Sequence, residues 1–118
     1  RRVNKHPIED LRMQELDPRL AARRKALSEQ DARYAALRRL HLEAAEIARG
    51  VDGAELLARA GKQIDVWEAN RTCSRVYVWA WRRILQDGAN GIQKLAISDA
   101  WYARPLLQNS PFGFMGRR

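Results

Sequence analysis

Apolar residues recur every three or four positions along most of the chain, which is the spacing of one face of an α-helix. From Pro18 to Arg49 neither glycine nor a second proline interrupts the pattern, which predicts one long helix or two helices joined near Ser28. Asp17 precedes Pro18, and this pair is typical of an N-cap followed by the first helical residue. The clearest break in the sequence is residues 50–53, "GVDG".

Four apolar residues of the long helical stretch have the spacing of a coiled-coil seam: Leu37, Leu40, Ala44 and Ile47. Such a seam predicts a homodimer. Its upstream continuation fails, because the corresponding positions hold Gln30 and Arg33. The alternative is an antiparallel hairpin packed against the rest of the domain, since so short a seam does not define an extended coiled coil.

Residues 54–70 predict two short helices, "AELLARA" and "KQIDVWEAN", with a tight turn at Gly61 between them. This arrangement is typical of a helix-turn-helix, in which the second helix enters a groove of DNA. Lys62 and Gln63 open that second helix, so they are the candidate base-reading residues.

The segment "CSRVYVWAWRRIL", which begins at Cys73, is compatible with a strand or a helix by composition. A half-buried strand alternates apolar and polar residues, but both alternating sets are apolar here. A helix from Ser74 to Gln86 has a capping residue at its start and Gly88 just beyond its end. We therefore expect a helix, with these side chains on its buried face: Tyr77, Trp81, Ile84 and Leu85.

The opposite face of this helix places a tryptophan among arginines. Trp79 has arginines four positions before it and three and four positions after it, and a further arginine precedes the helix. Either Trp79 packs under a neighbouring segment with arginines stacked on its rim, or this surface binds a partner. On the second interpretation, the phosphate contacts around Trp79 come from Arg71, Arg75, Arg82 and Arg83.

The remainder of the chain predicts shorter elements. Gly88, Asn90 and Gly91 are expected to close the preceding helix, and a short helix follows over Ile92–Ile97. A second helix, capped by Ser98, is expected to end at Pro105. The tail beyond it is irregular, and its large apolar residues either fold back on the domain or dock on a partner: Phe112, Phe114 and Met115.

These elements predict an all-α fold, a compact helical domain of five to seven helices with one long N-terminal helix or helical hairpin. Abundant alanine, leucine, arginine and glutamate support it, because these residues favour helices. We expect residues 1–7 to form a flexible basic leader, 8–107 a single helical domain, and 108–118 an irregular, partly apolar C-terminal tail.

The formal net charge of +8 and the pI near 10.5 add an expectation about partners. Most of the 22 basic residues are arginine, whose planar fork suits phosphate groups. We therefore expect a nucleic-acid-associated, DNA-binding or regulatory protein. The alternative is a protein–protein adaptor, or a structural component of a larger complex, whose positive charge is incidental.

The sequence offers little for catalysis. His6 and His41 have no metal-ligand partners at suitable spacing, and the phosphate-binding glycine motifs of nucleotide sites do not occur. We expect no catalytic residues, metal, cofactor or small-molecule ligand. The most specific enzymatic alternative is a nucleophile pair formed by Cys73 and His41.

A single cysteine excludes an internal disulfide, and no apolar run has the length of a membrane span. We therefore expect a cytoplasmic protein with no membrane partner.

Overall fold

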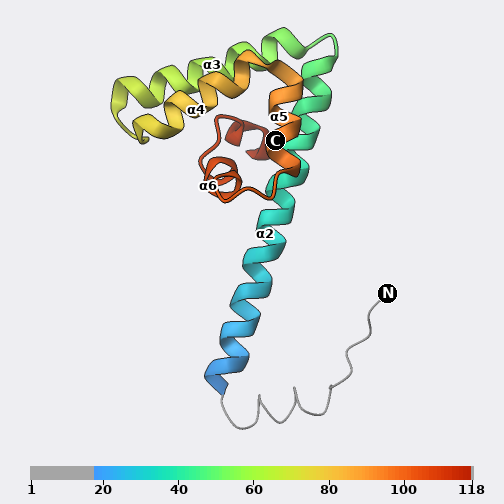
Figure 1. The fold of residues 1–118 in the computed structure, drawn as a ribbon, viewed down its shortest axis with the longest axis vertical. Coiled ribbons are helices and arrows are strands. Elements are labelled where there is room, and N and C mark those ends of the chain that lie inside the picture. The colour runs from blue at the N-terminus through green and yellow to red at the C-terminus, as the bar shows by residue number, and fades with distance from the viewer. Residues whose placement is uncertain (1–17, 118) are drawn as a thin grey trace. The chain divides into compact units, whose positions relative to one another are not determined.

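The computed structural model of the chain describes residues 18–117. Over these residues the fold is all-α with no strand, as the sequence predicts (Figure 1). The elements are α2 (Pro18–Arg49), α3 (Gly53–Asn70), α4 (Arg75–Gln86), α5 (Gly88–Ile97), α6 (Ala103–Gln108) and a 3-10 helix, η1 (Gly113–Arg117). The expected flexible leader at residues 1–7 and the expected N-cap, Asp17, lie outside the described residues.

Helix α2 is a single uninterrupted helix, which decides between the two alternatives for this stretch. It begins at Pro18, where the missing backbone N–H costs nothing because the first N–H groups of a helix have no partner within it. Ser28 lies in the helix and does not restart it. Contacts in the chain separate into two units at Arg33 and Tyr34, within α2. In the first unit, the described helical residues are mostly exposed, Leu20 and Leu27 among them.

The second unit has a core to which every helix from the end of α2 onward contributes. Figure 1 shows α3 and α4 side by side, joined by a short connection, and these two helices are in direct contact. The fully buried side chains of largest volume are Trp81, Phe112, Ile64, Ile92, Leu107, His41 and Pro111. Many other core positions are alanine, so a few large side chains make most of the apolar burial.

The predicted turn at Gly61 is wrong, because α3 runs through this residue as one helix. The reason is tertiary packing: Leu56, Ala60 and Ile64 are spaced four apart and are all buried, so one continuous stripe spans the glycine. Burial of that stripe outweighs the cost of glycine within a helix, which is about 1 kcal/mol. The helix-turn-helix geometry is therefore not present in this segment.

The predicted helix from Ser74 to Gln86 is confirmed as α4, and the Ser74 hydroxyl accepts a hydrogen bond from the backbone N–H of Val76 at 3.3 Å. Trp81 is buried as expected. Its three expected companions are only half-buried against the core: Tyr77, Ile84 and Leu85. Val78 is buried although the expected face did not include it, so the buried face is rotated from the predicted one.

Two boundaries after α4 differ from the expectation. Asn90 and Gly91 lie within α5, which starts immediately after Asp87, so only Gly88, with φ of 60°, marks the corner. A Cβ atom at Gly91 would overlap the carbonyl oxygen of Ile84, so this glycine allows α4 and α5 to approach closely.

The expected helix cap and helix end near α6 are also displaced. The Ser98 hydroxyl accepts a hydrogen bond from the N–H of Ala100 in the connection, and α6 starts only at Ala103. Pro105 lies inside α6, in its first turn, where a residue needs no intrahelical N–H partner.

The apolar tail folds back on the domain, which is one of the two arrangements that the sequence predicts. Phe112 and Met115 are buried in the core and Phe114 packs against it. The Phe112 ring lies edge-on to Trp81 and to His41, with centroid distances of 5.9 Å in both cases. The Trp81 indole N–H is directed at the carbonyl oxygens of Leu106 and Asn109, at 3.1 and 2.8 Å. The C-terminal segment is thus anchored through α4 and α2.

Candidate binding groove

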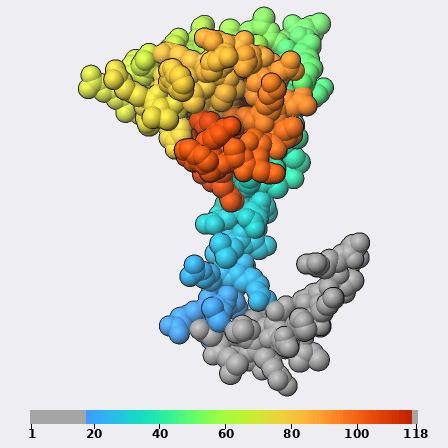
Figure 2. All heavy atoms as spheres, viewed as in Figure 1, coloured from blue at the N-terminus to red at the C-terminus, as the bar shows by residue number. Residues whose placement is uncertain are grey.

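An apolar groove lies between α4 and the segment that leads into α6. Its volume is about 660 Å³ and its exposed lining is almost entirely apolar. The lining residues are Ser74, Val76, Tyr77, Trp79, Ala80, Arg83, Ile84, Trp101, Tyr102, Pro105 and Leu106. In the space-filling view the residues of α4 (gold) and those around α6 (red-orange) lie next to each other on one face (Figure 2).

Three aromatic side chains of this groove are exposed to solvent. Trp79 is 73% exposed and Trp101 is 87% exposed, and Tyr102 is 47% exposed. The rings of Trp101 and Tyr102 meet edge to face, with centroids 5.8 Å apart. Val76 adds a fourth exposed apolar side chain on the first turn of α4. Exposed aromatic residues grouped at a groove are typical of a binding surface, since single proteins rarely leave such patches in water.

The helical geometry of α4 explains why Trp79 is exposed. Val78, Trp81 and Leu85 fall on one side of the helix and face the core. Trp79 falls on the other side, beside Arg75. Trp79 is 73% exposed, so no segment within residues 18–117 covers it. Trp79 therefore does not pack under a neighbouring segment of the described residues, and the interpretation that this surface binds a partner stays a prediction.

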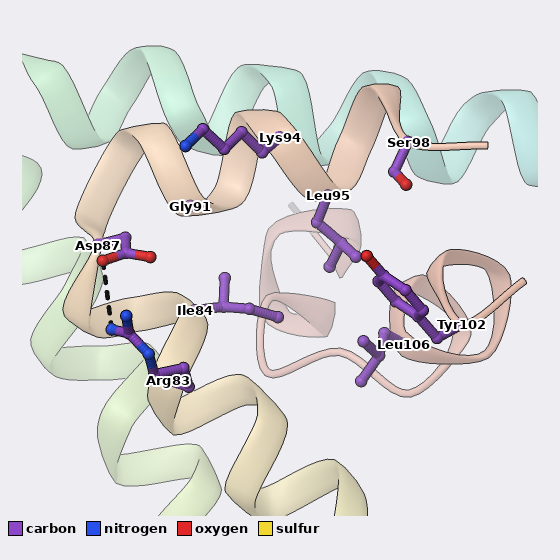
Figure 3. A pocket seen from close by; sticks show the side chains of 9 residues that line it. All are labelled: Arg83, Ile84, Asp87, Gly91, Lys94, Leu95, Ser98, Tyr102 and Leu106. Atoms are coloured by element: carbon purple, nitrogen blue, oxygen red, sulfur yellow. Dashed lines mark hydrogen bonds and ion pairs between the residues drawn. The ribbon is translucent and has the colours of Figure 1, made fainter. Parts of the chain in front are cut away.

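A second, smaller hollow adjoins the first and has a volume of about 200 Å³. The two share Arg83, Ile84, Tyr102 and Leu106. Figure 3 shows Ile84 and Arg83 projecting from α4 and Tyr102 and Leu106 from the opposite wall, with Lys94 on α5 above them. The dashed line in Figure 3 is the ion pair between Arg83 and Asp87, at 3.3 Å.

The two arginines expected to contact phosphate from the end of α4 are engaged within the chain. Arg82 forms ion pairs with Asp65 at 3.0 Å and with Glu68 at 2.9 Å. Its hydrogen bonds to the Glu68 carboxylate lower the pKa of that group. Arg83 pairs with Asp87 as described. These pairs are solvent-exposed, so a phosphate group would compete with them at modest cost.

The other two predicted phosphate-contacting arginines lie at the start of α4. Arg71 caps the end of α3 in a left-handed conformation, with φ of 54°, and Arg75 is exposed on the first turn of α4. The structure thus brings Arg75, Arg82 and Trp79 onto neighbouring parts of one helix surface, as the sequence predicts. None of the cation–π pairs in the described part of the chain involves Trp79.

Lys62 and Gln63 lie in the middle of α3 and not at the start of a recognition helix. Lys62 is exposed, whereas Gln63 is half-buried and lines a separate polar pocket with Trp67 and Phe114. Their assignment as base-reading residues depended on the predicted turn at Gly61. Because α3 has no turn there, the structure does not support that assignment.

The predicted dimer seam lies against the chain's own core. Ala44 is fully buried, and Leu40 and Ile47 pack against the same core. Leu37 is half-buried, and its carbonyl oxygen accepts a hydrogen bond from His41. The alternative expected from the sequence was an antiparallel hairpin packed against the rest of the domain. The packing is observed but the hairpin is not, because α2 is one uninterrupted helix. A homodimer stays a prediction, but Leu40, Ala44 and Ile47 already pack within their own chain.

Cys73 and His41 do not form the nucleophile pair considered from the sequence. The two ring nitrogens of His41 are occupied by the Leu37 carbonyl oxygen at 2.7 Å and the Ser110 hydroxyl at 2.6 Å. Cys73 is half-buried in the α3–α4 connection, and burial raises the pKa of its thiol, which makes it a weaker nucleophile at neutral pH. Residues 18–117 also contain no group of three or more side chains arranged to hold a metal ion.

Sequence reasoning missed the far wall of the groove, which Trp101, Tyr102, Pro105 and Leu106 form. The available signal was the adjacent pair Trp101-Tyr102 in a stretch too short for helical periodicity. Two neighbouring aromatic residues in a connection are unusual, because connections are mostly polar and lie on the surface.

No protein-family model, curated protein or solved structure matches the chain. None of the helices in the described range is both long enough and apolar enough to traverse a bilayer.

Proposed function

We propose that this chain is a binding protein that holds an apolar helical segment of a partner protein in the groove between α4 and α6. The observation that carries the proposal is the exposure of Trp79 and Trp101 on opposite walls of an apolar groove. Tryptophan and tyrosine supply most of the binding energy at many protein interfaces, particularly where they line a pocket. Amphipathic helices commonly bind in grooves of this kind.

The shape of α4 supports a helical occupant. Val76, Ala80 and Ile84 are spaced four apart along one side of α4 and all line the groove. At a rise of 1.5 Å per residue they span about 12 Å, which matches roughly two turns of a second helix. The apolar side chains of such a partner at i, i+3, i+4 and i+7 would face this row.

The experiment is a binding titration with synthetic helical peptides that share one leucine face and differ only in the residues of the polar face, which are glutamine, glutamate or lysine. Binding is measured by fluorescence anisotropy of a dye on the peptide. We expect at least one of the peptides to bind, and Trp79→Ala and Trp101→Ala each to weaken that binding about tenfold or more.

The matched control is Val66→Ala. Val66 is also an exposed apolar residue, but it lies on α3 and does not line the groove. If none of the peptides binds, or if Val66→Ala weakens binding as much as Trp79→Ala, the proposed function is wrong.

Contact with nucleic acid is the second candidate, and exposure of Trp79 beside Arg75 favours it. Bases stack on exposed aromatic rings, and arginines along the same surface contact the backbone. The net charge of +8 would add a non-specific electrostatic attraction. This candidate keeps Arg75 and Trp79 from the surface that the sequence predicts for nucleic acid.

Salt-titrated binding to single-stranded and double-stranded oligonucleotides tests this candidate. Electrostatic association weakens steeply with salt, and Arg75→Ala should reduce the slope by about one phosphate contact. Binding that is absent at low salt, or that salt does not change, would exclude it.

A further inference from the structure

We infer that the partner segment bound by the groove is acidic, with a carboxylate side chain at the end of the segment nearest Lys94. This inference rests on the proposed function and specifies its partner. It follows from the charged residues that line the groove and the adjoining hollow.

The lining of the two adjoining hollows contains three charged residues: Arg83, Asp87 and Lys94. Arg83 and Asp87 form an ion pair and neutralise each other. Lys94 is exposed and makes no hydrogen bond or ion pair in the described part of the chain. The lining therefore has one unpaired charge, and it is positive.

On the α3 side of α4, outside the lining of both hollows, the charged side chains are largely balanced. Arg82 is shared by Asp65 and Glu68. Arg75 makes no ion pair, but its positive charge favours the ionised form of Glu68. These two cations and two anions do not line the groove, so they give a segment bound in it little reason to prefer either sign of charge.

A partner helix that spans the groove would therefore experience a positive field mainly at its Lys94 end. A carboxylate there would form a charge-assisted hydrogen bond with a lysine that is otherwise unpaired. A lysine or arginine at the same place would be repelled, because like charges placed opposite each other at an interface are unfavourable.

The same charges argue against a second copy of this chain as the occupant. Two copies related by a two-fold axis present the same surface to each other, so Lys94 of each would face a groove whose unpaired charge is also positive. The net charge of +8 on each chain adds to this repulsion. A partner with acidic residues has neither disadvantage.

The test uses the peptides with glutamate, glutamine and lysine on the polar face, bound to the full chain at low ionic strength. We expect the glutamate peptide to bind at least about tenfold more tightly than the lysine peptide, with the glutamine peptide between them. Lys94→Glu should reverse this order. Arg75→Glu makes the same change of charge outside the lining of both hollows, and as the matched control it should change the order by less than about threefold.

Circular dichroism is used to check that Lys94→Glu is folded, and we expect it to be, because this side chain is exposed and unpaired. If the peptides bind through Trp79 and Trp101 but the lysine or glutamine peptide binds as tightly as the glutamate one, the inference fails and the proposed function stands. If no peptide binds, the proposed function itself fails. Oligonucleotide binding that is lost in Trp79→Ala would assign the groove to nucleic acid, and concentration-dependent self-association lost in Trp101→Ala would assign it to a second copy.

Discussion

The Nε2 atom of His41 lies 2.6 Å from the hydroxyl oxygen of Ser110, a residue 69 positions later in the chain. The Nδ1 atom lies 2.7 Å from the Leu37 carbonyl oxygen, which can only accept, so Nδ1 carries the proton and Nε2 accepts from the Ser110 O–H. The Ser110 oxygen accepts in turn from the N–H of Phe112, at 3.1 Å. Every polar atom of this buried chain of hydrogen bonds is satisfied when His41 is neutral.

This arrangement predicts that stability falls in mild acid. Burial lowers the pKa of His41 below its ordinary value of 6.5, so the unfolded chain takes up a proton at a pH where the folded chain does not. The contribution of neutral His41 to the free energy of unfolding is fully present above about pH 6.5. It is lost as the pH falls toward the folded-state pKa, and the free energy of unfolding then decreases by up to about 1.4 kcal/mol per pH unit.

Urea unfolding between pH 8 and pH 5 measures this loss. In a His6→Ala background His41 is the only histidine, since the chain has 2, so the remaining slope in this range belongs to His41. His41→Gln should be less stable at pH 8 and should lack the slope. A slope that persists in His41→Gln would contradict the explanation.

Two glycines within helices should respond in opposite directions to the same substitution. Gly61 has open space around the position of a Cβ atom, so Gly61→Ala should raise the free energy of unfolding by about 0.5–1 kcal/mol. Gly91→Ala should lower it by about 1–3 kcal/mol, because the new methyl group would overlap the Ile84 carbonyl. Chemical denaturation followed by circular dichroism measures both. A destabilising Gly61→Ala would indicate that α3 is not continuous at this residue.

The residues of the predicted coiled-coil seam should stabilise the fold of a single chain, without a second copy. Ile47 packs against the core of its own domain, so Ile47→Ala should lower the free energy of unfolding by about 2–3 kcal/mol. The unfolding midpoint should not depend on protein concentration. A midpoint that rises with concentration, and loses that dependence in Ile47→Ala, would restore the seam as a dimer contact.

Removal of the Phe112 ring should be among the most damaging single changes. The ring is fully buried and contacts both Trp81 and His41, so Phe112→Ala should cost about 3–5 kcal/mol. Phe114→Ala is the matched control, since Phe114 is only partly buried, and should cost less. Near-ultraviolet circular dichroism would report the altered environment of Trp81. Equal effects of the two changes would show that the tail is not anchored through Phe112.

Local sequence signals predicted the elements that local chemistry determines. Pro18 starts α2, Ser74 caps α4, and the break at residues 50–53 separates α2 from α3. Where tertiary packing decides, the same signals failed. Gly61 was expected to form a turn, but the buried stripe through Ile64 keeps the helix intact.

The candidate site shows the same division. One wall, with Trp79 among arginines on α4, could be predicted from helical spacing. The other wall could not, because Trp101 and Tyr102 come from a connection whose path is set by the packing of α5 and α6. The position of Lys94 beside the groove could not be predicted either, because it depends on how α5 packs against α4.

The hydrogen bond between His41 and Ser110 has a consequence during synthesis of the protein. A ribosome that has released α2 to α5 but not residues 110–115 exposes a nascent chain in which Trp81 and His41 lack their closing partners. Contacts that join residues so distant in sequence form late, and apolar surface left uncovered in the interval attracts other chains. Trp81 and His41 therefore stay uncovered until residues 110–115 can pack against them.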